Sequence, residues 1–195
     1  MTLQDLNELA DEVLMKRYGQ GNVGAFERLY ERHKGPLYRF VLRQINDRSV
    51  TDELVQDIWS KVIAQRGGYH VSAKFTTWLY TIARNRVIDH HRAQGRRLGI
   101  ELSADDPIDD ITQESFVCDQ RPELMLESDQ SLDQIRQLVA ELPATQREAF
   151  VLKYDAGFNH HDIAAITGHK EETIKSQIRY AISKLKQGLF GGRHD

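Results

Sequence analysis

Apolar residues recur three and four positions apart along most of the chain, which is the spacing of one face of an α-helix. The alternation of apolar and polar residues that is typical of strands is scarce. In the first half of the chain this spacing predicts helices over residues 3–14, 26–45, 51–64 and 75–92. In the second half it predicts helices over residues 132–142, 144–154, 159–166 and 170–186.

Individual residues refine the predicted start, continuity and connection of the first four helices. Thr51 is the expected N-cap of its helix, because its hydroxyl can accept from a free amide and acidic residues follow it. Pro36 removes one backbone donor and is expected to bend or interrupt the helix over residues 26–45. The glycines within residues 66–74 indicate a loop.

Between residues 98 and 131 the helical periodicity fails and acidic residues dominate. Such a segment buries little apolar surface and is typical of an extended, solvated connection. The sequence therefore predicts an all-α protein with two small helical domains, over residues 1–97 and 132–195. The acidic segment is expected to be a flexible linker between them.

The last two predicted helices are arranged as a helix-turn-helix. A short helix over residues 159–166 is followed by a turn containing Gly168 and by the longer helix over residues 170–186. One face of the longer helix is apolar: Ile174, Ile178, Ala181, Ile182 and Leu185. The opposite face is polar, which suits reading of the major groove, although an ordinary amphipathic surface helix has the same pattern.

Charge is distributed unevenly along the chain. Lys and Arg outnumber Asp and Glu by 16 to 11 in residues 1–97, and by 9 to 7 in residues 134–195. In residues 98–133 one basic residue faces 11 acidic ones. Two basic modules flanking an acidic segment favour a protein that binds a polyanion such as a nucleic acid.

Other functional classes find little support in the sequence. Cys118 is the only cysteine, which excludes an internal disulfide and a thiolate zinc cluster and fits a cytoplasmic protein. No apolar run is long enough for membrane insertion. The adjacent pairs His90-His91 and His160-His161 would point about 100° apart on a helix and would not chelate a metal together. No catalytic motif is present, so we expect no enzyme, no metal and no cofactor.

Several short strings resemble the extracytoplasmic-function family of bacterial RNA polymerase sigma factors. In the C-terminal half they are Leu142-Pro143, Arg147, Gly157, Ile163-Ala164, Gly168 and Thr173-Ile174-Lys175-Ser176. In the N-terminal half they are Asp52-Glu53-Leu54-Val55-Gln56-Asp57 and the stretch from Phe75 to Asn85. The strings occur in the family's order and cover about residues 20–95 and 135–188.

This resemblance implies a sigma factor that binds core RNA polymerase, recognises promoter DNA and promotes strand opening. The polymerase-binding residues would be Asp52, Glu53, Leu54, Gln56, Asp57 and Trp59. The promoter-melting contacts would be Tyr69, His70, Lys74, Arg84, Asn85, Arg86 and Arg92. The upstream-element contacts would be Lys153, Glu172, Thr173, Lys175, Ser176, Arg179 and Tyr180. An anti-sigma factor is a further partner that the family commonly has.

Some alternatives remain open at the level of sequence. Trp78 lies at helical spacing with apolar neighbours, so it is more often a core residue than a DNA contact. Gln177 replaces a frequent arginine of the family, which leaves the promoter sequence open. The linker is either a solvated tether or, as in related factors, a segment that threads the polymerase cleft. A one-component helix-turn-helix regulator with an N-terminal sensory domain is the alternative function.

Overall fold

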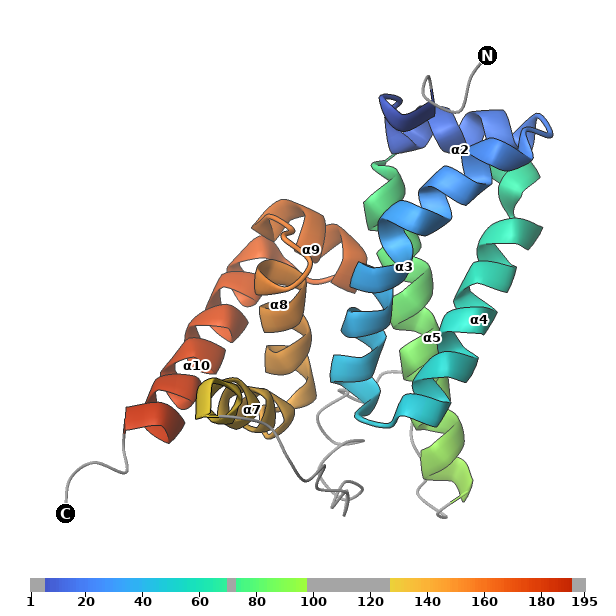
Figure 1. Cartoon of the computed structure of the whole chain (residues 1–195). Coiled ribbons are helices and arrows are strands. Elements are labelled where there is room, and N and C mark those ends of the chain that lie inside the picture. Colours follow the sequence, from blue (N-terminus) through green and yellow to red (C-terminus); the bar gives the residue numbers. More distant parts are fainter. Residues whose placement is uncertain (1–5, 70–72, 98–126, 191–195) are drawn as a thin grey trace.

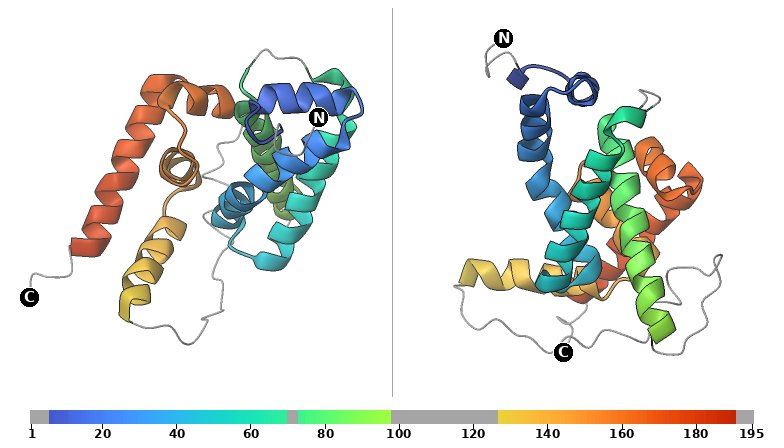
Figure 2. Two further views of the ribbon diagram at one scale, coloured as in Figure 1. Left: turned by 45° about the horizontal axis from the view of Figure 1, so that its top comes forward. Right: turned by 90° about the vertical axis from the view of Figure 1, so that its right-hand side faces the viewer.

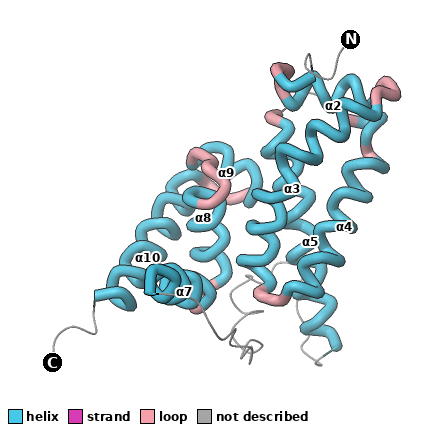
Figure 3. Tube along the Cα trace, in the orientation of Figure 1, coloured by secondary structure: helices cyan, strands magenta, loops and turns pink. Residues whose placement is uncertain are grey.

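The computed structural model describes residues 6–69, 73–97 and 127–190. All regular elements within these ranges are helices, and Figure 3 shows no strand among them. This confirms the predicted all-α class. The acidic segment from residue 98 to residue 126 lies outside the described residues, as does His70.

In its described residues, the N-terminal module contains four complete α-helices and one short 3-10 helix. They are α2 (Asp11–Gly19), α3 (Val23–Ile45), α4 (Arg48–Ala64), the 3-10 helix η1 (Arg66–Gly68) and α5 (Phe75–Arg97). Helices α3, α4 and α5 run side by side, and α2 crosses one end of them (Figure 1). Their shared core is apolar and fully buried, and includes Leu29, Leu37, Leu54, Ile58 and Leu79.

The described part of the C-terminal module, residues 127–190, contains four helices. They are α7 (Glu127–Ala140), α8 (Ala144–Tyr154), α9 (His160–Thr167) and α10 (Glu171–Phe190). Helix α7 begins within the range predicted as linker. Helix α10 packs along α8 and against α9 and α7 (Figure 1). Leu152, Ile163 and Ile174 are fully buried where α8, α9 and α10 meet.

Three local predictions differ from the structure. The helix expected over residues 3–14 is not continuous, because Arg32 of α3 donates to the carbonyls of Asn7 and Leu9 and residues 8–10 form a turn before α2. Helix α3 runs through Pro36, so of the two expected effects of this proline, a bend or an interruption, the interruption does not occur. Helix α4 is capped by the Asp47 carboxylate, which accepts from the backbone N–H of Val50, and begins earlier than predicted.

The two modules pack against each other instead of lying apart. Helix α9 contacts α5, and α8 contacts α3 (Figure 2). The rings of Tyr80 on α5 and Phe158, in the segment between α8 and α9, meet edge to face with 4.8 Å between centroids. Both side chains are buried, so apolar area is removed from water where the modules meet.

Candidate nucleic-acid interface

A groove of about 500 Å³ lies between α3 and α4 on the surface of the N-terminal module. Its walls are aromatic: Phe26 and Tyr30 come from α3, and Trp59 comes from α4. The Tyr30 and Trp59 rings meet with 5.0 Å between centroids. The indole N–H of Trp59 is buried and has no hydrogen-bond partner in the structure. An aromatic groove of this kind offers apolar area to a partner side chain.

The residues predicted to bind polymerase divide between this groove and other positions. Asp52, Gln56 and Trp59 line the groove. Glu53 is exposed. Leu54 is fully buried, so it anchors α4 in the core and does not offer a contact surface. The carboxylate of Asp57 is instead bound by an arginine of α5.

That arginine is Arg86, one of the residues predicted to contact promoter DNA. Its Nε and Nη2 both donate to one oxygen of Asp57, at 2.9 and 2.7 Å. The structure therefore joins one predicted polymerase contact and one predicted DNA contact in a single ion pair. Asn85, the residue before Arg86, is exposed and has an amide able to hydrogen-bond a base edge. Arg92 is half-buried further along α5.

An aromatic cluster stands at the start of α5. Tyr69 meets Trp78 with 5.1 Å between ring centroids, and Phe75 lies 5.9 Å from Trp78. Trp78 is half-buried in this cluster, which agrees with the packing role expected for it. The Tyr69 hydroxyl has no hydrogen-bond partner in the structure. Burial, with the nearby carboxylates of Glu12 and Asp11, raises the pKa of Tyr69 to about 12.

The N-terminus of α5 is held from a distant part of the chain. The carboxylate of Glu12 on α2 accepts from the backbone N–H of Phe75 at 2.8 Å. This contact satisfies an amide that would otherwise lack a partner, and the negative charge suits the positive end of the helix dipole. It fixes the direction in which α5 leaves the loop, and therefore the position of the aromatic cluster.

The helix-turn-helix is built as the periodicity predicts. Asn159 caps α9 by accepting from the backbone N–H of Asp162, and Gly168 ends α9 at a φ of 74°, where a residue with a side chain would be strained. The apolar face of α10 is buried through Ile174, Ile178, Ala181 and Leu185. The predicted packing face of this helix is therefore confirmed.

The opposite face of α10 is open to solvent. The exposed members of the predicted upstream-element set on this helix are Glu172, Thr173, Lys175, Arg179 and Tyr180. Lys175 donates to Glu172 at 2.7 Å, and this hydrogen bond holds the pKa of the Glu172 carboxyl below its usual value. The Arg179 guanidinium lies 5.5 Å from the Tyr180 ring centre. Ser176 donates to the Glu172 carbonyl and is half-buried, as is Lys153 on α8.

Sequence reasoning missed the acidic residues that pair with the basic residues of the first module. Arg84 Nε lies 3.0 Å from a Glu148 carboxylate oxygen, and Lys74 Nζ lies 2.9 Å from an Asp162 oxygen. Arg84 and Lys74 are both predicted DNA contacts. The carboxylates come from helices far along the chain, so no local signal points to these pairs.

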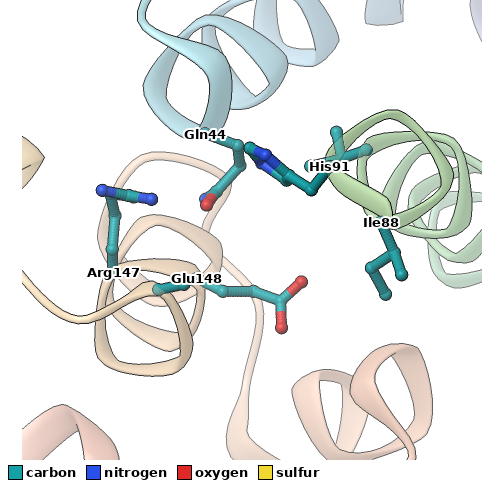
Figure 4. Close-up of a pocket in the computed structure, with 7 residues that line it drawn as sticks. Gln44, Ile88, His91, Arg147 and Glu148 are labelled. Carbon is teal, nitrogen blue, oxygen red and sulfur yellow. The ribbon is translucent and has the colours of Figure 1, made fainter. Parts of the chain in front are cut away.

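A small cavity of about 10 Å³ lies where α3, α5 and α8 meet (Figure 4). His91, Gln44 and Glu148 are among the residues that line it. Arg147, which also lines it, donates to the carbonyl of Ala140 at 2.8 Å and so ties the end of α7 to α8. Arg147 is one of the C-terminal positions that carry the family resemblance, and this contact gives it a structural role.

Neither a metal cluster nor a membrane helix is found in the parts of the chain that the structure describes. Across residues 6–69, 73–97 and 127–190 there is no group of three or more His, Cys, Asp or Glu side chains placed to hold a metal ion. None of the helices in these ranges combines the length and the apolar character needed to cross a bilayer.

Comparison with known families and relatives gives a consistent result. The family described as Sigma-70 region 2 matches residues 29–97, and Sigma-70, region 4 matches residues 132–185. The ECF RNA polymerase sigma-E factor of Escherichia coli is 30% identical over 192 residues, which cover 94% of this chain and 97% of that protein. The RNA polymerase sigma-H factor of Pseudomonas aeruginosa is 28% identical, with 95% and 98% covered.

Two solved structures share the arrangement of helices. The sigma factor RpoE of Bartonella quintana, in complex with the anti-sigma factor NepR, matches with a TM-score of 0.66 and 26% identity, covering 86% of this chain and 98% of that one. CnrH, in complex with the cytosolic domain of CnrY, matches with a TM-score of 0.69 and 20% identity, covering 94% and 99%. The second likeness concerns the fold alone.

Proposed function

The chain belongs to the extracytoplasmic-function family of RNA polymerase sigma factors, which act in transcription initiation, and from that premise we propose how its surfaces divide the work. The groove between α3 and α4 binds the polymerase. The start of α5 and its neighbouring loop hold the opened promoter strand. The exposed face of α10 reads the upstream promoter element.

The polymerase-binding role of the groove rests on one observation, its aromatic walls beside an acidic rim. Asp52 is exposed at this rim, and Trp59 lines the wall beside Gln56. Apolar area at the centre and charge at the edge are the usual composition of a protein interface. The matching partner is a helix with apolar anchors and basic flanking residues.

Strand opening requires capture of bases that have left the duplex stack. The half-buried ring of Tyr69, which packs against Trp78, gives a stacking surface, and the exposed amide of Asn85 gives hydrogen bonds to a base edge. No covalent chemistry is needed for this step. We therefore assign the chain no enzymatic activity and no cofactor.

Reading of the upstream element is assigned to α10 for a geometric reason. Its buried apolar face leaves Lys175, Arg179 and Tyr180 exposed on the outside of the module. Helices with this division place one face on the protein and the other in the major groove. Phosphate contacts by Lys175 and Arg179 would supply affinity, and base contacts would supply specificity.

The partners of the chain follow from these assignments. They are core RNA polymerase, promoter DNA and an anti-sigma factor, the last because related RpoE is found with NepR. A protein that serves polymerase on chromosomal DNA is placed in the cytoplasm. The alternative of a one-component regulator does not account for the match to Sigma-70 region 2 across residues 29–97.

The groove assignment is tested with Asp52→Lys, which reverses the charge at the groove rim. Binding of the variant to core polymerase should weaken by roughly tenfold, because a cation then faces the basic partner helix. Asp133→Lys is the matched control, since Asp133 is exposed on α7 and pairs only along its own helix with Arg136 in the structure. Affinity is measured by fluorescence titration, and transcription from promoters selected out of genomic DNA by the reconstituted holoenzyme is the second readout. Equal affinities for the two variants would refute the groove assignment.

A further inference from the structure

Among residues 6–69, 73–97 and 127–190, three ion pairs join the modules, and all three have the same polarity. Arg84 pairs with Glu148 at 3.0 Å, Arg43 with Asp155 at 3.2 Å, and Lys74 with Asp162 at 2.9 Å. Every cation belongs to the N-terminal module and every carboxylate belongs to the C-terminal module. The C-terminal module therefore presents an acidic surface, formed by Glu148, Asp155 and Asp162, to a basic surface of its neighbour.

Apolar packing lies among these ion pairs. Phe158 stands between Asp155 and Asp162 in the sequence and packs edge to face on Tyr80 of α5. Phe158 is 7% exposed and Tyr80 is 3% exposed. The acidic surface thus surrounds a buried aromatic contact, which is the arrangement of a specific interface with an apolar centre and a charged rim.

The Arg84–Glu148 pair is the most deeply placed of the three. The side chains of Arg84 and Glu148 are 14% and 9% exposed. Removing one member of an ion pair that is shielded from water leaves the charge of the other member uncompensated, which costs free energy. A shielded ion pair therefore favours one specific partner. The other two pairs are more open to solvent and are screened by salt.

Two of the paired cations are residues that the sequence predicts to contact promoter DNA. They are Arg84 and Lys74, whose charges are paired here with carboxylates. A carboxylate on an arginine or lysine offers the same charge-assisted hydrogen bonds that a phosphate offers. The acidic surface therefore offers these cations the same kind of partner that a nucleic-acid backbone would offer.

We propose that the acidic surface of the C-terminal module is an intramolecular competitor of single-stranded DNA for the face of α5 that carries Arg84. The free chain is closed by this contact, and DNA or polymerase must displace it before α5 can hold a strand. The effect of this contact on DNA binding rests on the proposed function. The packing of the two modules against each other does not depend on that function.

The closed state is tested by a zero-length carbodiimide crosslink in the full chain. Lys74 and Asp162 are an amine and a carboxylate in direct contact, so an isopeptide bond between residues 74 and 162 should form and be found by mass spectrometry. The Lys175–Glu172 pair within α10 is the internal control, because its 2.7 Å contact does not depend on how the modules sit. Core polymerase or about 1 M salt should reduce the first crosslink and leave the control. Absence of the first crosslink in the free monomer, with the control present, would overturn the proposal.

Competition with DNA is tested with the double variant Asp155→Asn with Asp162→Asn. Loss of two inter-module ion pairs should raise affinity for a fluorescent single-stranded oligonucleotide of mixed sequence by about threefold to tenfold, because less free energy is needed to open the chain. The matched control is Asp133→Asn with Glu141→Gln, which removes the same charge from exposed positions of the same module.

The two sets of outcomes separate this inference from the proposed function. Equal affinity of the two double variants, or no measurable binding by either, would refute the competition. Failure of the wild-type chain to direct transcription with core polymerase would refute the proposed function while leaving the crosslink result valid. Oligonucleotide binding that increases only in the Asp155→Asn with Asp162→Asn variant supports the competition.

Discussion

Acidification should weaken the fold through one buried histidine at the contact between the modules. His91 of α5 is 3% exposed and lines the small cavity with Gln44 of α3 and Arg147 of α8 (Figure 4). Burial, and then the neighbouring His90 and Arg147, lower the pKa of His91 to about 4. The imidazole is therefore neutral in the folded chain at neutral pH.

The size of the effect follows from proton linkage. In the unfolded chain His91 has a pKa near 6.5, so below that pH the unfolded state binds a proton that the folded state does not. The free energy of unfolding must then fall as the pH falls through the window between the two values. From pH 7.5 to pH 5.5 the loss from His91 alone is about 1 kcal/mol, and it approaches about 3 kcal/mol below pH 4.

The assay is urea denaturation of the wild type and of His91→Leu at about pH 7.5 and pH 5.5. Leucine fills a similar volume without a titrating group, and its packing cost should be the same at both pH values. The wild type should lose about 1 kcal/mol more than the variant on acidification. Other groups titrate in both proteins and cancel in this difference. An equal loss in the two proteins would show that His91 is protonated without cost in the fold, and would refute the reasoning.

Two further predictions concern the C-terminal module. A Cβ on Gly188 of α10 would meet the Leu138 side chain of α7, which must move aside, so Gly188→Ala should lose most of the gain of about 1 kcal/mol that alanine brings to a helix interior, as measured by urea denaturation. Gly35→Ala, where nothing lies closer than 3.5 Å, is the control and should hold or raise the free energy of unfolding. Replacing Lys175 and Arg179 with alanine should weaken duplex promoter binding and reduce the slope of log K against log salt by about 2, because roughly one released counterion is lost per phosphate contact. An unchanged slope would mean that α10 does not face the DNA.

Several features of this protein follow from short-range sequence patterns alone. The packing face of α10 was predictable because helical geometry places residues three and four apart on one side, and Ile174 and Ile178 are buried there. The turn of the helix-turn-helix was predictable because Gly168 tolerates the left-handed backbone conformation found at the end of α9. Each of these features depends on interactions within about one or two helical turns.

Other features depend on how distant segments approach each other. Leu54 belongs to a polar string that suggested a contact surface, yet the packing of α4 against α3 and α5 buries it. The start of α5 is fixed by Glu12, a residue of α2. In both cases, contact with another helix determined a feature that the local sequence did not determine.

The basic residues of the N-terminal module show most clearly what the sequence determines and what only the tertiary structure decides. The sequence determined that Arg84, Arg86 and Lys74 are cations on or beside a helix, which is enough to predict affinity for a polyanion. Only the tertiary structure decided their neighbours, which are Glu148, Asp57 and Asp162. A charge is attracted by any opposite charge, so its partner is set by which surfaces the packing of apolar residues such as Tyr80 and Phe158 brings together.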